Sequence, residues 1–161
     1  MMKIKHLCAY MQTAHVFAEL SSCTRLKVGC VVVNTQHRII SIGYNGTPPG
    51  WDNGCEDADN NTLPDVLHAE ENAFDKLAGS TESGAGAKVF TTHSPCLGCA
   101  KRIAGAGVAE LYFANHYRDT KGLDYLCRRG VRVYELKIKG AGQARVERYA
   151  SPAARGSWSY L

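Results

Sequence analysis

The sequence has no apolar run approaching the roughly 20 residues that a helix needs to cross a bilayer. Its first residues are not followed by the long apolar core and small-residue cleavage site of a signal peptide, so none is expected. It also lacks any run of five or more basic residues. The net charge of +4 is mild and diffuse, which argues against a nucleic-acid groove and favours small anionic ligands such as nucleotides. We therefore expect a cytoplasmic protein whose partners are neither membrane nor nucleic acid.

The cysteines do not follow the pattern of a secreted domain held together by disulfides. There are seven, at positions 8, 23, 30, 55, 96, 99 and 127, whereas such domains are shorter and usually have an even number. A reducing compartment, with some of these cysteines on a metal, fits better. At 161 residues and with no internal repeat, the chain is most simply one domain that buries roughly 70% of its unfolded surface.

The first half of the chain predicts a helix, a hairpin, a loop and a second helix. Residues 3–20 place apolar side chains near a helical period. Val28 to Val33 and Ile39 to Tyr44 are β-branched runs separated by a short polar link, which predicts a hairpin. Residues 45–64 are rich in Gly, Pro, Asn and Asp and form a loop of the length that is usually functional. The second helix spans about 66–78 and ends at Gly79.

The second half alternates strand and helix. The predicted order is strand 88–92, helix 96–106, strand 110–114, helix 119–129 and strand 131–136. Such alternation indicates parallel strands with helices on both faces. The predicted fold is therefore an α/β protein, a three-layer α/β/α sandwich around a five-stranded mixed sheet in which the N-terminal hairpin precedes the parallel strands.

The C-terminal segment differs in composition from the rest. Residues 139–161 mix Gly, Ala, Arg and Ser and include Trp158 and Tyr160. We therefore divide the chain into a domain over 1–138 and a partly ordered tail over 139–161, and we expect this tail to pack on a neighbouring subunit.

Two short motifs supply the ligands of a catalytic zinc site. His68 and Glu70 open one predicted helix, and Pro95, Cys96 and Cys99 open the next, directly after a strand. Catalytic zinc typically takes three protein ligands and leaves one position for water, and His68, Cys96 and Cys99 supply three. The first turn of a helix favours thiolate, because its free N–H groups and the positive end of the dipole lie there. Glu70 is left to move protons, as base and then as acid.

Two other interpretations of these motifs remain. A structural zinc needs a fourth ligand, which Cys23 or Cys55 could provide. A thioredoxin-like dithiol would use Cys96 and Cys99 but would leave His68 and Glu70 unexplained.

The H-x-E and P-C-x-x-C pattern is that of zinc-dependent nucleobase deaminases. From about Cys23 to Leu136 the chain resembles the deoxycytidylate (dCMP) deaminase family of the cytidine deaminase-like superfamily. The resemblance lies in K-V-G-C-V-V-V at 27–33, G-Y-N-G-x-P-x-G at 43–50, H-A-E-E-N-A at 68–73 and S-P-C-L-G-C-A-K at 94–101. The glycine-rich loop and Asn72 separate this family from adenosine, guanine and riboflavin-pathway deaminases, which share only the metal motifs.

This resemblance implies a zinc-dependent hydrolysis of dCMP to dUMP and ammonia, which supplies dUMP for thymidylate synthesis. It implies a homo-oligomer, commonly a hexamer. In regulated members dCTP activates and dTTP inhibits, and Mg²⁺ accompanies the triphosphate near a subunit boundary.

The resemblance also implies roles for individual residues. Asn45 matches an asparagine that contacts the sugar hydroxyl, while the Ala69 N–H and the Ser94 carbonyl lie where the pyrimidine is read. Tyr117 is a candidate to stack on the base, with a half-buried loop tyrosine as the alternative. The candidates for substrate phosphate are Ser22, Thr24, Arg25 and Lys27, although Arg25 and Lys27 could be solvated charges. The effector candidates are Gly43, Tyr44, Gly46 and Asn72, although Asn72 could brace the loop and the glycines could only form turns. His93 and His116 are interpreted as structural histidines.

One departure from the family concerns a second, structural zinc. Some members bind it through cysteines matching Cys23 and Cys55, a histidine in a longer insertion and a carboxylate two residues before the catalytic histidine. Here that position is Val66, and residues 56–67 contain no histidine. We therefore expect this second site to be lost.

Two further functional classes compete with dCMP deamination. The same metal chemistry could act on free cytidine or on an adenosine in RNA, and the domain could be a zinc-stabilised binding module without turnover. A 5′-phosphate pocket argues against a nucleoside, and the lack of a basic groove argues against RNA.

Overall fold

The computed structural model describes residues 1–152, so the predictions for Trp158 and Tyr160 lie outside the described residues. The helices are α1 (Ile4–Ala18), α2 (Ala69–Ala78), α3 (Leu97–Gly105) and α4 (Lys121–Arg128). The strands are β1 (Gly29–Val33), β2 (Ile39–Tyr44), β3 (Lys88–His93), β4 (Glu110–Asn115), β5 (Arg132–Gly140) and β6 (Gln143–Arg148). Each helix and strand predicted from the sequence is present, with ends that differ by a few residues. None of the helices within residues 1–152 is long and apolar enough to span a bilayer.

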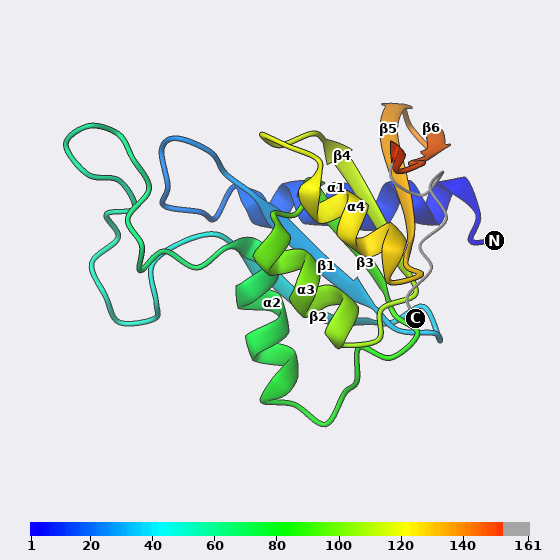
Figure 1. The fold of residues 1–161 in the computed structure, drawn as a ribbon, viewed down its shortest axis with the longest axis horizontal. Helices are drawn as coiled ribbons and strands as arrows, with labels where there is room; N and C mark the ends of the chain where they lie inside the picture. Colours follow the sequence, from blue (N-terminus) through cyan, green and yellow to red (C-terminus); the bar gives the residue numbers. More distant parts are fainter. Residues whose placement is uncertain (153–161) are drawn as a thin grey trace, which may run out of the picture.

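The strands form one mixed sheet in the order β2-β1-β3-β4-β5-β6 (Figure 1). The β1–β2 hairpin is antiparallel and β1 pairs antiparallel with β3, whereas β3, β4 and β5 run parallel. The predicted hairpin followed by parallel strands is therefore confirmed.

The predicted number of five strands is wrong, because β6 adds a sixth strand antiparallel to β5. β5 continues past the predicted boundary at residue 138, and part of the segment assigned to a tail belongs to the sheet. Residues 143–148 do alternate, since Ala144 and Val146 pack against the core while the residues between them are exposed. The glycines beside this short run, including Gly142 at φ 70°, made the segment look irregular.

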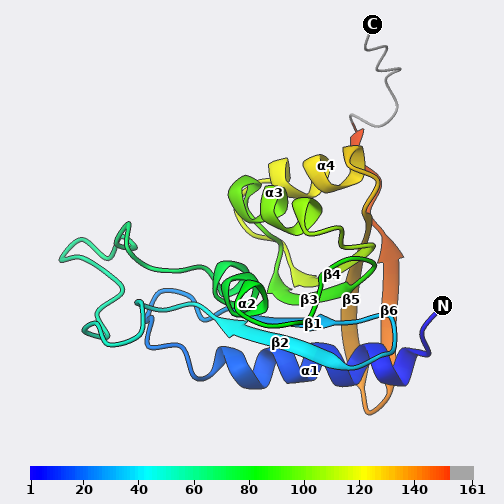
Figure 2. The ribbon, with the colours of Figure 1, turned by 90° about the horizontal axis from the view of Figure 1, so that it is seen from below.

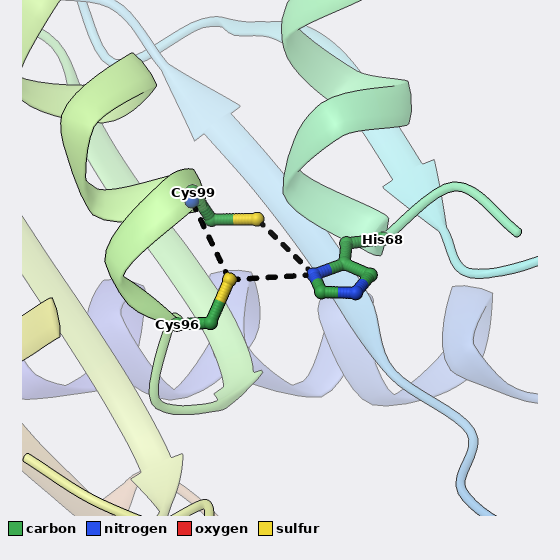
Figure 3. A group of neighbouring side chains, drawn as sticks. All are labelled: His68, Cys96 and Cys99. Carbon is green, nitrogen blue, oxygen red and sulfur yellow. Dashed lines mark hydrogen bonds between the residues drawn. The ribbon is translucent and has the colours of Figure 1, made fainter. Parts of the chain in front are cut away.

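Helices cover both faces of the sheet, as predicted. Figure 2 shows α1 on one side and α2, α3 and α4 on the other. Successive side chains of β1 point to opposite faces of the sheet, and both faces are apolar. Val31 and Val33 pack with α1, whereas Cys30 and Val32 pack with α2 and α3. The resulting three-layer arrangement directs the N-termini of α2 and α3 toward each other at the ends of β1 and β3 (Figure 3).

The segment between β2 and α2 projects away from the sheet (Figure 1). It is tied to the segment before β1 by a disulfide between Cys23 and Cys55, whose Cα atoms lie 5.1 Å apart. The expectation that the cysteines are free or bind metal is therefore wrong for this pair. The cysteines are 32 residues apart in sequence, and only the fold brings them together.

Candidate active site

His68, Cys96 and Cys99 converge on one point between α2 and α3 (Figure 3). The Nδ1 atom of His68 lies 3.5 Å from the sulfur of Cys96 and 3.4 Å from the sulfur of Cys99. All three ligand atoms lie within 4.8 Å of one another.

This arrangement fits zinc. Bonds of about 2.3 Å to sulfur and about 2.0 to 2.1 Å to nitrogen, at tetrahedral angles, imply nitrogen–sulfur separations of about 3.5 Å. Both nitrogen–sulfur distances at His68 match that value. Three soft ligands leave a fourth tetrahedral position for water or substrate, which is the pattern of a catalytic site.

Two helix N-termini position these ligands. His68 is the N-cap of α2, and its backbone N–H donates to the Glu71 carboxylate at 2.8 Å. Cys96 is the N-cap of α3, and its sulfur accepts a hydrogen bond from the Cys99 N–H at 3.5 Å. Since both N-caps have extended backbone, the side chains leave the helix axes and meet in the space between them.

Two glycines allow these helix starts to pack closely on their supports. A Cβ atom on Gly43, in β2, would lie 2.2 Å from the carbonyl oxygen of Ala69, the first residue of α2. A Cβ atom on Gly122, in α4, would lie 2.1 Å from the carbonyl oxygen of Pro95. Neither separation leaves room for a Cβ atom. Because Gly43 and Gly122 have no side chain, the turns that carry His68 and Cys96 can approach β2 and α4 this closely.

The three candidate metal ligands have strongly shifted pKa values. Hydrogen bonds from Cys99 and His68 lower the pKa of the Cys96 thiol to about 3. The hydrogen bond to Cys96 raises the pKa of His68 to about 9, against the opposing effect of burial. The neighbouring Cys96 sulfur and burial raise the pKa of Cys99. A ready-formed thiolate at Cys96 suits a cation, which would replace the proton shared among these groups.

Glu70 lies beside this cluster and is 4% exposed. Burial raises the pKa of its carboxyl to about 7, partly opposed by a hydrogen bond from the Glu70 backbone N–H and by the charge of His68. A carboxyl that titrates near neutral pH can both accept and release a proton there.

A cavity opens beside Glu70 and contains several of the predicted substrate residues. It is lined by Arg25, Asn45, Ala69, Ser94 and Tyr117, together with His68, Glu70 and Cys96. A second cavity adjoins this one at its mouth. Neither cavity is lined by Ser22, Thr24 or Lys27, which were also predicted to bind phosphate. Of the four phosphate candidates, the structure therefore brings only Arg25 to this site.

Asn45 and Ser94 also hold neighbouring backbone. The Asn45 amide accepts from the Val28 N–H at 2.8 Å and donates to the Leu26 carbonyl at 2.7 Å. The Ser94 hydroxyl accepts from the Tyr117 N–H at 2.8 Å. These contacts set the walls of the cavity on two sides.

The predicted effector residues gather where β2 ends against α2. The Asn72 amide donates to the Tyr44 carbonyl at 2.9 Å, and the Lys76 ammonium lies 5.6 Å from the centre of the Tyr44 ring. Gly46 exchanges two backbone hydrogen bonds with Leu67. Asn72 thus braces this loop, which is the alternative raised for it from the sequence.

The two histidines interpreted as structural have protein partners. His93 Nδ1 lies 3.0 Å from the Thr92 hydroxyl, and burial lowers the pKa of His93. His93 also lines the inner cavity. His116 packs edge-on against Phe113, and its Nε2 lies 3.9 Å from a Glu135 oxygen.

The second, structural zinc site, which the sequence analysis expects to be lost, would lie at Cys23, Cys55 and Val66. Val66 packs against Cys23 and Cys55 in a small buried cluster, and these two sulfurs are bonded to each other. Glu56 is the one acidic side chain grouped with them among the described residues. Because they bond each other, Cys23 and Cys55 do not act as a fourth ligand to the His68 cluster.

Glu56 and Arg118 are charged residues of the site that were not predicted from the sequence. Glu56 lines the inner cavity, and its Oε1 atom accepts hydrogen bonds from the backbone N–H groups of Thr24 and Arg25, each at 3.0 Å. Arg118 lies at the mouth of the cavity. Arg118 directly follows Tyr117, and this position could have indicated that Arg118 belongs to the site. No local sequence pattern indicates that Glu56, in the loop after β2, belongs to it.

Comparisons with known proteins agree with this site. Residues 4–115 match the family described as the cytidine and deoxycytidylate deaminase zinc-binding region. The deoxycytidylate deaminase of Saccharomyces cerevisiae is 35% identical over 139 residues, which cover 80% of this chain and 44% of that protein. The human deoxycytidylate deaminase is 32% identical over 119 residues, covering 69% of this chain and 66% of that protein. The chain thus corresponds to part of the length of these relatives.

A solved structure is similar over almost its whole length. The crystal structure of the dCMP deaminase from cyanophage S-TIM5, in complex with dCMP and dUMP, is 48% identical. It has a TM-score of 0.82, covering 84% of this chain and 99% of that one. By family match, identity and fold, this chain belongs to the cytidine and deoxycytidylate deaminase family.

Proposed function

We propose that this protein catalyses the zinc-dependent hydrolysis of dCMP to dUMP and ammonia. The observation on which this rests is the buried Glu70 carboxyl beside the convergent His68, Cys96 and Cys99, in the wall of a cavity. The likeness to the cyanophage dCMP deaminase supports dCMP as the substrate.

His68, Cys96 and Cys99 would hold the zinc ion. When bound, zinc acts as a Lewis acid that lowers the pKa of water to about 7. Glu70 accepts a proton from the attacking water and transfers it to the ring nitrogen of the pyrimidine. Glu70 then accepts the proton of the new C4 hydroxyl and donates it to the C4 amine, so that the C–N bond breaks, ammonia leaves and the C4 carbonyl forms; one carboxyl thus serves as base and as acid. In the zinc-free protein, burial raises the pKa of Glu70 to about 7, so this buried carboxyl can carry a proton near neutral pH.

The walls of the cavity orient the base. In this proposal the Ala69 N–H and the Ser94 carbonyl bind polar atoms of the pyrimidine, Asn45 contacts the sugar and Tyr117 borders the ring. Support comes from the common position of all four residues on one cavity. Solvent exclusion follows from burial, because Ala69, Glu70 and Ser94 are each less than 5% exposed.

Substitution of Glu70 tests the mechanism. E70Q and E70A are expected to retain one zinc per chain, measured by metal analysis, and to lose at least about 100-fold in kcat. E82Q removes the same charge at an exposed position and is the matched control. If the wild type deaminates dCMP and E70Q does so at the same rate, Glu70 is not the proton carrier. If the wild type does not deaminate dCMP at all, a zinc-stabilised binding module becomes the better account.

A substrate panel separates the competing enzymes. Ammonia release from dCMP, CMP, dCTP and deoxycytidine is expected to be fastest with dCMP. A faster reaction with the nucleoside would favour a cytidine deaminase, and activity on adenosine in RNA would favour an editing enzyme.

We further propose that dCTP with Mg²⁺ activates and dTTP inhibits a homohexamer, through the β2–α2 residues Gly43, Tyr44, Gly46 and Asn72. In this proposal the enzyme works in the cytoplasm and supplies dUMP for thymidylate synthesis. Dependence of the dCMP rate curve on dCTP and dTTP tests regulation, and light scattering tests the oligomer. If neither nucleotide changes the curve, the regulatory part is wrong whether or not the chemistry is right.

A further inference from the structure

The disulfide between Cys23 and Cys55 belongs to one wall of the inner cavity, beside the candidate metal cluster. Cys23 and Arg25 line this wall from the segment before β1. Glu56 and Val66 line it from the loop after β2. The disulfide joins these two segments across 32 residues of sequence. A change in this bond therefore acts directly on the wall of the cavity.

A second connection between the two segments lies next to the disulfide. Glu56 follows Cys55 in the sequence, and its Oε1 atom accepts hydrogen bonds from the N–H groups of Thr24 and Arg25, at 3.0 Å each. These bonds are exposed, so water competes for both partners. The disulfide keeps the partners close together and so lowers the entropy that forming the hydrogen bonds costs. The hydrogen bonds at Glu56 therefore depend on the disulfide.

Few other contacts fix the loop after β2, which projects away from the sheet (Figure 1). Cys55 and Val66 form a small buried cluster with Cys23. In the described part of the chain, no other residue of the loop 45–67 belongs to a buried hydrophobic cluster. The two isolated backbone bridges of this region pair residues of the loop with each other. The disulfide is thus the main connection between this loop and the rest of the cavity wall.

The chemistry open to this cysteine pair is thiol–disulfide exchange. Structural zinc takes four ligands, whereas Cys23, Cys55 and Glu56 would supply three and Val66 has no ligand atom. Cys23 and Cys55 are 2% and 1% exposed, and Cys23 lines the inner cavity. An attacking thiolate therefore reaches the bond through the cavity, where a bound nucleotide would stand in its way.

We propose that Cys23 and Cys55 form a thiol–disulfide exchange site that regulates nucleotide binding in the inner cavity. A small dithiol reduces the bond, so that two protein thiols form and the dithiol becomes a cyclic disulfide. A small disulfide reverses the step and leaves as two thiols. The oxidised form binds the nucleotide more tightly, because its cavity wall is already fixed. This rests on the proposed function, since the nucleotide is the proposed substrate or product.

The test compares oxidised wild type, wild type reduced with a phosphine that is then removed, and the C23S/C55S variant, with zinc measured in each. Reduction and C23S/C55S are each expected to raise the KM for dCMP by about 5-fold, with kcat changed by less than about 2-fold. Unfolding of part of the enzyme would lower the apparent kcat without changing KM, so KM is the decisive quantity. Reoxidation of reduced wild type with a small disulfide should restore the lower KM.

C127S is the matched control, because Cys127 is a free cysteine that lines neither of the two adjoining cavities. Oxidised C127S is expected to have the KM of oxidised wild type and to respond to reduction in the same way. The proposal is overturned if reduced wild type has the KM of the oxidised form. It is also overturned if C23S/C55S behaves as oxidised wild type does, because the effect of reduction would then arise elsewhere.

Binding of dUMP provides a measurement that needs no turnover. Calorimetry is expected to show about 5-fold tighter binding to the oxidised form. Because coupling between two equilibria is reciprocal, saturating dUMP should shift the dithiol–disulfide equilibrium toward the disulfide by the same factor. If no redox state deaminates dCMP, the proposed function fails, while redox-dependent dUMP binding still supports the exchange site. Equal dUMP affinities in the two redox states would overturn the proposal whether or not dCMP is deaminated.

Discussion

Gly122 of α4 lies directly against the backbone of Pro95, so that a Cβ atom at this position would be 2.1 Å from the Pro95 carbonyl oxygen. It would also be 2.9 Å from the carbonyl oxygen of Cys96. The helix after β4 thereby supports the turn that carries Cys96, one of the candidate metal ligands. This contact links the packing of α3 and α4 to the geometry of the candidate zinc site.

Substituting alanine at Gly122 should displace this turn. Because the clashing atoms are backbone, G122A is expected to cost about 1 to 3 kcal/mol of stability. It is also expected to lower zinc affinity, because His68 and Cys96 would no longer meet at the same separation. Thermal unfolding with and without a chelator, together with zinc titration of the chelated protein, measures both effects.

Gly105 provides the matched control. It ends α3 and is exposed, and a Cβ atom added there would meet no atom within 4 Å beyond the backbone of its own helix and its chain neighbours. G105A is therefore expected to leave zinc affinity unchanged and to stabilise the helix by up to about 1 kcal/mol. Equal zinc affinities for G122A and wild type would show that the α3–α4 contact does not position the site.

Local patterns predicted much of the fold, and contacts distant in sequence account for the rest. The helical and alternating periods located four helices and five strands, because each period reports the face that a segment buries. The cluster of His68, Cys96 and Cys99 was predictable because these residues occur in two short motifs. The contact between Gly122 and Pro95 was not, since a glycine in a helix has no local signature of what packs on it.

The binding surface was less predictable than the metal cluster. The loop after β2 has no periodic pattern of apolar residues. Its disulfide, and the hydrogen bonds from the Thr24 and Arg25 N–H groups to Glu56, are therefore known only from the folded chain. Sequence position suggested that four residues before β1 face the phosphate. In the fold, Arg25 alone of these lines the cavity, and Arg118 approaches from the other side.

Glu56 is predicted to act through Arg25. E56A removes the acceptor of two backbone hydrogen bonds and is expected to raise the KM for dCMP several-fold with little change in kcat. E56Q keeps an oxygen acceptor and removes a negative charge from the cavity wall, so its KM should equal or fall below that of wild type. Steady-state kinetics on the two variants decide this. An equally raised KM in E56Q and E56A would mean that the charge, not the hydrogen bonds, is what matters.

The disulfide between Cys23 and Cys55 is predicted to stabilise the loop after β2. Closing a loop of this size constrains the unfolded chain by about 2 to 4 kcal/mol, which corresponds to roughly 5 to 10 °C in Tm. A phosphine reductant should therefore lower the Tm of wild type, and the C23S/C55S double variant should show the lower Tm with or without reductant. A wild-type Tm unaffected by reductant, after thiol titration confirms reduction, would contradict this.

Glu70 is predicted to make the stability of the zinc-free protein depend on pH. Burial raises the pKa of its carboxyl from 4.5 to about 7, so the folded state favours the protonated form. Its stabilising contribution is complete below about pH 4.5 and is lost as the pH rises through 7, up to about 3 kcal/mol in all at 1.36 kcal/mol per pKa unit. E70Q, a neutral isostere, lacks this dependence.

Urea unfolding of chelated protein should thus show wild type losing stability relative to E70Q between pH 4.5 and 7. The lowered pKa of Cys96 acts on both proteins and largely cancels in the difference, while the raised pKa of His68 matters mainly above pH 6.5. Parallel pH profiles for the two proteins would mean that Glu70 is ionised throughout this range, and its suitability as a proton carrier at neutral pH would then depend on the metal alone.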